Sequence, residues 1–131
     1  MKNTTRFQVI PLAEGRRIKV FGVLRNGKGE VVEFLAQLKM DRRNEYQLMQ
    51  HSLQFVADYF PHVRESRLRK LKGRPLEDVW EIKRGQHRLY GFIAPGGLYL
   101  YRYDFKTKQK PNAALLSSVA ECRHEWREQY G

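Results

Sequence analysis

The sequence predicts an α+β domain in which a helical hairpin packs on a mainly antiparallel sheet and a further helix follows the sheet. Two adjacent segments, residues 30–38 and 41–60, carry apolar residues at three- and four-residue spacing. Residues 79–105 contain short segments of alternating character separated by tight turns. Residues 112–130 carry a last helical pattern. This order of strands and helices predicts helices on one face of the sheet.

The start of the chain is expected to form short strands. Residues 6–12 and 16–24 are either two strands or one interrupted strand, because their apolar residues recur close to a period of two. Two glycines in residues 26–29 mark a turn. We expect residues 1–6 to be flexible, and the chain from 1 to 131 to form one domain.

The helices carry their own boundary signals. Asp41 is a good N-cap for the second helix, and Pro61 ends that helix. Its buried stripe follows steps of three and four residues and comprises Tyr46, Met49, Leu53, Val56 and Phe60. The last helix begins at Pro111-Asn112. Its buried side comprises Leu116, Val119, Ala120, Trp126 and Tyr130.

Residues 61–74 form a basic connector between the helical hairpin and the sheet. Three strands are then expected, at residues 79–84, 87–93 and 98–105. A two-residue turn, Gly85-Gln86, joins the first two of them. Alternation along the last strand predicts one face with Leu98, Leu100, Arg102 and Asp104, and another with Tyr99, Tyr101, Tyr103 and Phe105.

The charge of the chain points to an anionic partner. The 131 residues include 25 Lys and Arg against 14 Asp and Glu, a formal net charge of +11, which is typical of nucleic-acid binders. A basic domain with an acidic protein partner would carry the same charge, so charge alone leaves both open. The single Cys122 allows no intramolecular disulfide and fits a reducing compartment. No apolar run reaches the ~20 residues that span a bilayer. We therefore expect a cytoplasmic protein without a membrane partner.

The common catalytic motifs are missing from the sequence. It contains no GxxxxGK[ST], GxGxxG, CxxC, HExxH or GxSxG pattern. The four histidines are scattered, and none lies beside a second ligand at metal spacing. We therefore expect neither a metal site nor a cofactor.

A set of short segments remains, and their order and spacing carry more information than any one of them. The set comprises Leu71-Lys72-Gly73, Val79-Trp80-Glu81-Ile82-Lys83, His87-Arg88-Leu89-Tyr90, Phe105-Lys106-Thr107-Lys108 and Pro111. Together with residues 32–38, which are similar to a first-helix pattern, it resembles the RelE/ParE toxin superfamily. The likeness is to the RelE/HigB branch of phage-derived toxin-like proteins and spans residues 16–130.

The resemblance implies two helices on a curved antiparallel sheet. It also implies the toxin of a type II toxin-antitoxin system, a metal-independent endoribonuclease that cuts mRNA on the ribosome. The implied partners are mRNA, the ribosome and a cognate antitoxin that holds the toxin inactive in a hetero-oligomer. The ParE branch shares the fold and acts on DNA gyrase. Two alternatives thus remain open, namely a toxin acting non-catalytically on a protein target and a basic nucleic-acid-binding module.

Metal-free RNA cleavage needs in-line attack by the 2′-OH, a proton acceptor, a proton donor and positive charge at the phosphate. Arg88 is the expected phosphate clamp, because a mid-strand position would fix a guanidinium that can bind two phosphate oxygens. Lys70 and Lys72 match the basic pair that the family places before its second sheet strand, and clustered cations lower a lysine pKa toward that of a base. Lys106 and Lys108 are expected to supply the acid or to contact phosphate. A solvated basic linker would carry the same lysines.

Further RNA contacts are expected from Arg67, Arg69, Arg102, Tyr103 and Lys110. Tyr103 would stack on a base if its face were open, and would otherwise belong to the core. Glu81 would accept a proton or form a salt bridge with a neighbouring cation. Related toxins often have His or Tyr where this chain has Asp104 and Phe105, so the identities of the general acid and base stay open.

Overall fold

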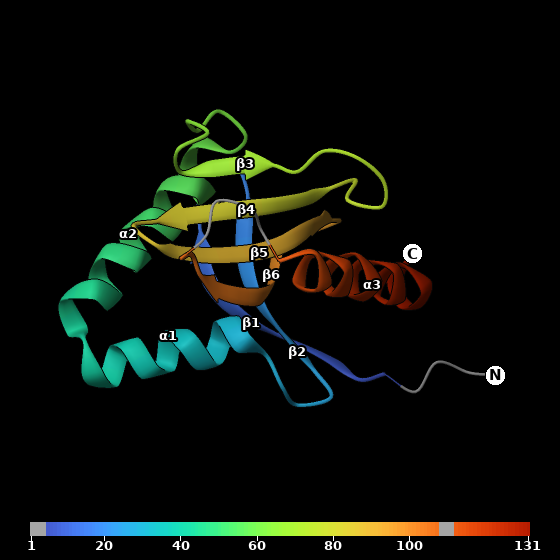
Figure 1. Ribbon diagram of the computed structural model, residues 1–131, viewed down its shortest axis with the longest axis horizontal. Helices are drawn as coiled ribbons and strands as arrows, with labels where there is room; N and C mark the ends of the chain where they lie inside the picture. Colours follow the sequence, from blue (N-terminus) through green and yellow to red (C-terminus); the bar gives the residue numbers. More distant parts are fainter. Residues whose placement is uncertain (1–4, 108–111) are drawn as a thin grey trace.

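The computed structural model describes residues 5–107 and 112–131 and confirms the α+β class (Figure 1). In chain order the elements are β1 (Phe7–Glu14), β2 (Lys19–Arg25), α1 (Glu30–Asp41), α2 (Arg43–Tyr59), β3 (Leu68–Lys70), β4 (Val79–Arg84), β5 (His87–Ala94), β6 (Gly97–Phe105) and α3 (Ala113–Tyr130). None of the described helices is both long and apolar enough to cross a bilayer.

The described strands form one open six-stranded sheet in the order β1-β2-β6-β5-β4-β3. β2 runs parallel to β6, and every other neighbouring pair is antiparallel. The N-terminal hairpin therefore docks against the last strand of the chain, while β3 and β1 form the two edges. The mainly antiparallel sheet predicted from the sequence is confirmed.

Helices cover both faces of the sheet, so the expectation of helices on one face is wrong. The hairpin of α1 and α2 buries Leu35, Leu53 and other residues against one face, and α3 buries Val119 against the other. In Figure 1, α1 and α2 lie on one side of the sheet and α3 on the opposite side. The cause is visible on β5, where the consecutive residues Leu89 and Tyr90 are both buried but belong to different cores.

A bulge in β6 breaks the alternation predicted for that strand. Tyr90 pairs with Arg102, but Gly91 pairs with Leu100, which leaves Tyr101 as an extra residue. Tyr99 consequently joins the core under α3, whereas Tyr103 packs against the core under α1 and α2. The predicted single aromatic face of β6 is wrong, because a one-residue shift moves all later side chains to the other face.

The bulge depends on Gly91. A Cβ atom built on this residue would lie 2.1 Å from the backbone carbonyl oxygen of Tyr99 on the neighbouring strand. We expect Gly91→Ala to lower the free energy of unfolding by about 3 kcal/mol, because backbone rather than a flexible side chain has to move. Urea denaturation followed by circular dichroism measures this. Ser117→Ala, on the exposed side of α3, is the control, and an equal effect of both changes would contradict the explanation.

The helix boundaries differ from the prediction at one place. Asp41 is the last residue of α1, where it accepts a hydrogen bond from the side chain of Gln37, and it is not the N-cap of α2. The chain turns within the single residue Arg42, at φ −141°, so no loop separates the two helices. The start predicted for α3 agrees with the structure, where Asn112 is the N-cap and its side chain accepts hydrogen bonds from the backbone N–H groups of the first turn.

The basic connector contains a strand that the sequence does not predict. Leu68 of β3 pairs with Ile82 of β4 and is 2% exposed, and Leu71 is also buried, so two leucines anchor the connector to the sheet edge. A strand of three residues is too short to show a period. At the other end of the described chain, Thr5 donates a hydrogen bond to Glu125 and the backbone N–H of Arg6 donates one to Asn26. Residues 1–4 of the segment expected to be flexible lie outside the described residues.

Candidate nucleic-acid interface

Four cationic side chains meet on the sheet face that also carries α3. Arg69 of β3 lies opposite Glu81 of β4, and Lys83 of β4 lies opposite Arg88 of β5. Lys106 follows β6, and its backbone N–H donates a 2.8 Å hydrogen bond to the carbonyl of Gln86 in the β4–β5 turn. We call Arg69, Lys83, Arg88 and Lys106 the cation cluster. It contains two of the predicted catalytic residues, Arg88 and Lys106, and one predicted RNA contact, Arg69.

A buried carboxylate pairs with two cations of the cluster, Arg69 and Lys83. Glu81 is 0% exposed and accepts a 2.7 Å hydrogen bond from the hydroxyl of Tyr90. Its other oxygen lies 3.3 Å from Nε of Arg69 and 3.9 Å from Nζ of Lys83. Burial and the hydrogen bond to Glu81 raise the pKa of Tyr90, so this phenol stays protonated and donates. The salt bridge considered for Glu81 is thus present, with Lys83 and Arg69 as its cations.

Lys83 is the titratable centre of the cluster. Its pKa is lowered mainly by burial, and the positive charges of Arg69, Arg88 and Lys106 lower it further, whereas Glu81 opposes the shift. The side chain is still 20% exposed, so it can be reached from solvent. A lysine with a lowered pKa is neutral more often near neutral pH and can then accept a proton.

Arg88 is the second residue of β5, next to the Gly85-Gln86 turn, so the mid-strand position expected for it is wrong. Its Nη1 atom donates hydrogen bonds to the carbonyls of Gly85, at 2.6 Å, and of His87, at 3.0 Å. Within the described part of the chain, its Nε atom is buried and has no hydrogen-bond partner. The turn therefore fixes the guanidinium in one orientation, as a phosphate clamp requires.

Three other predicted residues lie in and around β3 but do not belong to the cation cluster. Lys70 pairs with Trp80, which packs against the core under α1 and α2, so the Lys70 side chain belongs to the opposite face. Lys72 follows β3 and, together with Lys70 and the cluster residue Arg69, borders a cavity of about 320 Å³ near the start of α3. The guanidinium of Arg67 lies over the ring of Phe55, at 5.6 Å from its centre. The basic pair at 70 and 72 is thus not brought to Arg88.

Arg102 and Tyr103 have internal partners. Arg102 forms a 2.6 Å ion pair with Glu30 at the start of α1 and donates a 2.5 Å hydrogen bond to Ser118 of α3. Tyr103 stacks on Phe34 with ring centres 3.8 Å apart, and its hydroxyl lies 2.9 Å from Nδ1 of His87. Both side chains join helices to β6. The remaining predictions, Lys108 and Lys110, lie outside the described residues.

Lys83 was not among the predicted site residues, although the pairing of the β4–β5 hairpin places it opposite Arg88. A two-residue turn at Gly85-Gln86 fixes the pairing of the two strands, which places Lys83 opposite Arg88. Glu81 is two residues before Lys83 and therefore shares its face. The register of the hairpin is therefore enough to predict that Lys83 lies beside Arg88.

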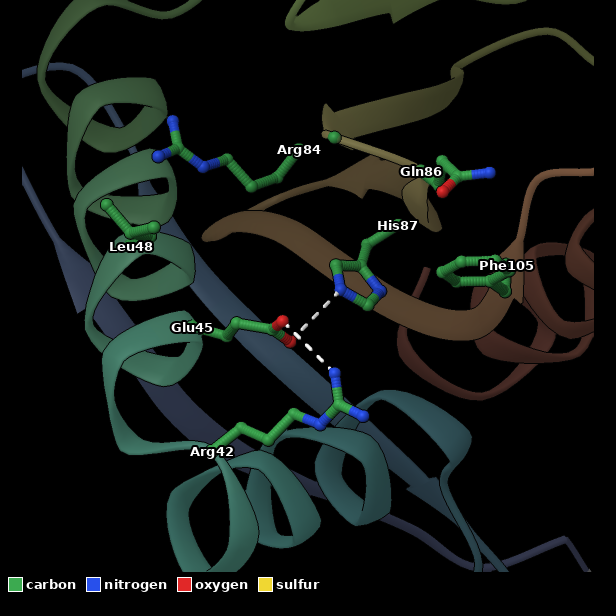
Figure 2. A pocket seen from close by; sticks show the side chains of 8 residues that line it. Arg42, Glu45, Leu48, Arg84, Gln86, His87 and Phe105 are labelled. Carbon is green, nitrogen blue, oxygen red and sulfur yellow. Dashed lines mark hydrogen bonds and ion pairs between the residues drawn. The ribbon is translucent and has the colours of Figure 1, made fainter.

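The other face of the same hairpin carries a pocket of about 370 Å³. Glu45 and Leu48 line it from α2, Arg42 from the junction of α1 and α2, and Arg84, His87 and Phe105 from the sheet. In Figure 2, the side chains of His87 and Arg42 both point toward Glu45. We call this cavity the turn pocket, because it lies beside the Gly85-Gln86 turn.

No protein-family model matches the chain, and no curated protein matches it either. The resemblance to the RelE/ParE superfamily therefore remains a prediction from the sequence. Among residues 5–107 and 112–131, no three or more His, Cys, Asp or Glu side chains lie together in a group that could hold a metal ion.

Proposed function

We propose that the protein is a RelE/HigB-like toxin, an mRNA endoribonuclease that acts on the ribosome without a metal ion. The observation that carries this proposal is the cation cluster, in which strand ends far apart in sequence place Arg69, Lys83, Arg88 and Lys106 together. Positive charge, a proton acceptor and a proton donor are what this reaction requires. The helical hairpin on one face of a mainly antiparallel sheet also supports the fold that the resemblance implies, although β2 runs parallel to β6.

The proposed reaction is an attack of the ribose 2′-OH on the adjacent phosphorus. The neutral amine of Lys83 accepts the 2′-OH proton as the new O2′–P bond forms. Arg88 and Arg69 balance the charge that builds up on the phosphorane oxygens. The P–O5′ bond then breaks, and the ammonium of Lys106 donates a proton to O5′. The products are a 2′,3′-cyclic phosphate and a 5′-hydroxyl, and exchange with water restores both lysines.

In this proposal Lys83 takes the role of base that the sequence assigned to Lys70 or Lys72. Lys83 lies opposite Arg88 and has a lowered pKa, whereas Lys70 faces the other side of the sheet. Lys70 and Lys72 remain candidates for contacts to ribosomal or messenger RNA outside the cluster. A cognate antitoxin would block activity by covering the cluster, and acidic side chains would suit such a partner.

Expression of the protein in a bacterium tests the function. We expect the wild type to stop growth and to fragment mRNA, and Arg88→Ala to restore growth and intact mRNA, because removal of one transition-state donor costs about 10²- to 10³-fold in rate. Growth curves and primer extension on a reporter mRNA measure both effects. Arg17→Ala, an exposed arginine in the β1–β2 turn, is the matched control and should behave as the wild type.

Other outcomes would reject the proposal. Growth arrest with intact mRNA would indicate a protein target, and loss of plasmid supercoiling in the presence of purified protein would point to gyrase. Normal growth with intact mRNA for both the wild type and Arg88→Ala would exclude a toxin and favour a basic nucleic-acid-binding module. Thermal unfolding of purified Arg88→Ala is measured alongside, because Arg88 also bonds to the turn carbonyls.

A further inference from the structure

The turn pocket is a second concave site on the same hairpin, and no step of the proposed reaction uses it. Its volume of about 370 Å³ suits a group of a few rings rather than a single ion. It opens between α2 and the ends of β4, β5 and β6. Figure 2 shows residues from the helices and from the sheet facing each other across it.

The pocket lining includes two exposed apolar side chains, Leu48 on α2 and Phe105 at the end of β6 on the opposite side. Phe105 and Leu48 are each 46% exposed, which is unusual for large apolar side chains in a folded domain. The ring of His87 meets Phe105 edge to face, with centres 5.6 Å apart. An accessible aromatic ring beside a cavity is a stacking surface for a nucleobase.

The pocket lining also carries two cations, one from the junction of α1 and α2 and one from β4. Arg42 and Arg84 both line the pocket, and Glu45 is its one carboxylate among the described lining residues. Arg42 lies 3.3 Å from Glu45 in an exposed pair, which holds a guanidinium only weakly. Arg84 forms no ion pair with any described residue. Two guanidiniums against one carboxylate favour an anionic ligand such as a phosphodiester.

Polar groups at the base of the pocket are held in place. His87 lies between the Tyr103 hydroxyl, at 2.9 Å from Nδ1, and the Glu45 carboxylate, at 3.7 Å from Nε2. Tyr103 is in turn stacked on Phe34. A preorganised imidazole and carboxylate beside a stacking ring can hydrogen-bond to the edge of a base.

The turn pocket and the cation cluster lie on opposite faces of the sheet at the same end of the β4–β5 hairpin. Arg84 pairs with His87, and the next pair along the hairpin is Lys83 with Arg88. Consecutive residues lie 3.8 Å apart in Cα position but point to opposite faces. The Gly85 turn between them is open, since a Cβ atom built there would meet no atom within 4 Å. A flexible single strand with its phosphate at Arg88 can therefore pass around the turn into the pocket.

We propose that the turn pocket binds a nucleotide of the RNA next to the cleaved linkage, with its base on Phe105 and its phosphate at Arg84 and Arg42. This inference rests on the proposed function for the identity of the ligand. It adds a base-selecting site that lies outside the cation cluster. Since Glu45 and His87 present hydrogen-bonding groups to the base edge, the pocket would contribute sequence preference as well as affinity.

Binding without cleavage tests the pocket. The probe is a fluorescein-labelled RNA hexanucleotide with 2′-O-methyl riboses, which cannot be cleaved by 2′-OH attack. We expect Phe105→Ala and Arg84→Ala each to raise its Kd by about tenfold or more in fluorescence anisotropy, and Phe105→Leu to weaken binding as well. Tyr59→Ala, at another exposed aromatic, and Arg17→Ala are the matched controls and should leave Kd unchanged.

The outcomes separate this inference from the proposed function. Unchanged Kd for folded Phe105→Ala and Arg84→Ala, with weaker binding for Arg88→Ala, would overturn the pocket and leave the nuclease intact. Weaker binding for the pocket variants of a protein that never cleaves mRNA would support the pocket and reject the nuclease. Amide chemical shifts on addition of AMP, GMP, CMP or UMP locate the contact independently. Shifts at residues 84–87 and 105 support the pocket, and their absence with all four nucleotides contradicts it.

Discussion

Lys83→Arg is expected to abolish mRNA cleavage while RNA binding stays within about twofold of the wild type. Arginine keeps the positive charge that attracts the phosphate, but it cannot lose its proton in a protein and so cannot act as a base. Loss of a general base costs about 10²- to 10⁴-fold in rate. Cleavage of mRNA on purified ribosomes gives the rate, and anisotropy with the 2′-O-methyl hexanucleotide gives the Kd.

The pH dependence of the cleavage rate is a second test of Lys83 as the general base. Burial and three neighbouring cations lower the pKa of Lys83, so its neutral form increases as pH rises through a value below the ordinary one for lysine. The cleavage rate of the wild type should rise with pH over that range and then level off. Lys28→Arg, in the exposed β2–α1 turn, is the control and should keep this profile. Full activity of Lys83→Arg at every pH would show that the base is another group.

The strands and helices with long periodic patterns were predictable from the sequence. The predicted boundaries of β4 and the predicted start of α3 agree with the structure, because a tight turn and an Asn before a helix are local signals. The bulge at Tyr101 was not predictable in this way. It depends on the close approach of Gly91 to β6, which is a contact between strands and leaves no pattern within either one.

The same distinction applies to the candidate site. Arg88 and Lys106 could be found by motif, and the structure brings them to one face. Lys70 and Lys72 were predicted because they precede the sheet strands in sequence. The unpredicted strand β3, however, pairs Arg69 with Glu81, so Arg69 is the β3 residue that belongs to the cluster. The electrostatics of Lys83 depend on cations from three other segments, so composition and spacing could not reveal its lowered pKa.

Glu81→Ala is expected to lower the free energy of unfolding by about 3–5 kcal/mol, because breaking a buried ion pair leaves charges uncompensated. Arg69 and Lys83 would lose the one carboxylate within ion-pair distance of them among the described residues, and the buried Tyr90 hydroxyl would lose its acceptor. Urea denaturation followed by tryptophan fluorescence measures the change. Glu81→Gln, which keeps an acceptor for Tyr90 but not the charge, should lie between Glu81→Ala and the wild type.

Glu77→Ala provides the matched control for this effect. Glu77 lies 3.7 Å from Arg74 in a solvent-exposed pair, so its removal should change stability by no more than about 0.5 kcal/mol. If Glu81→Ala is as stable as Glu77→Ala, the cations of the cluster do not depend on a buried counter-charge. The cluster would then be a solvated basic surface, and the lowered pKa of Lys83 would lose its structural cause. A large difference between the two variants instead ties the stability of the sheet to the same carboxylate that positions the proposed catalytic cations.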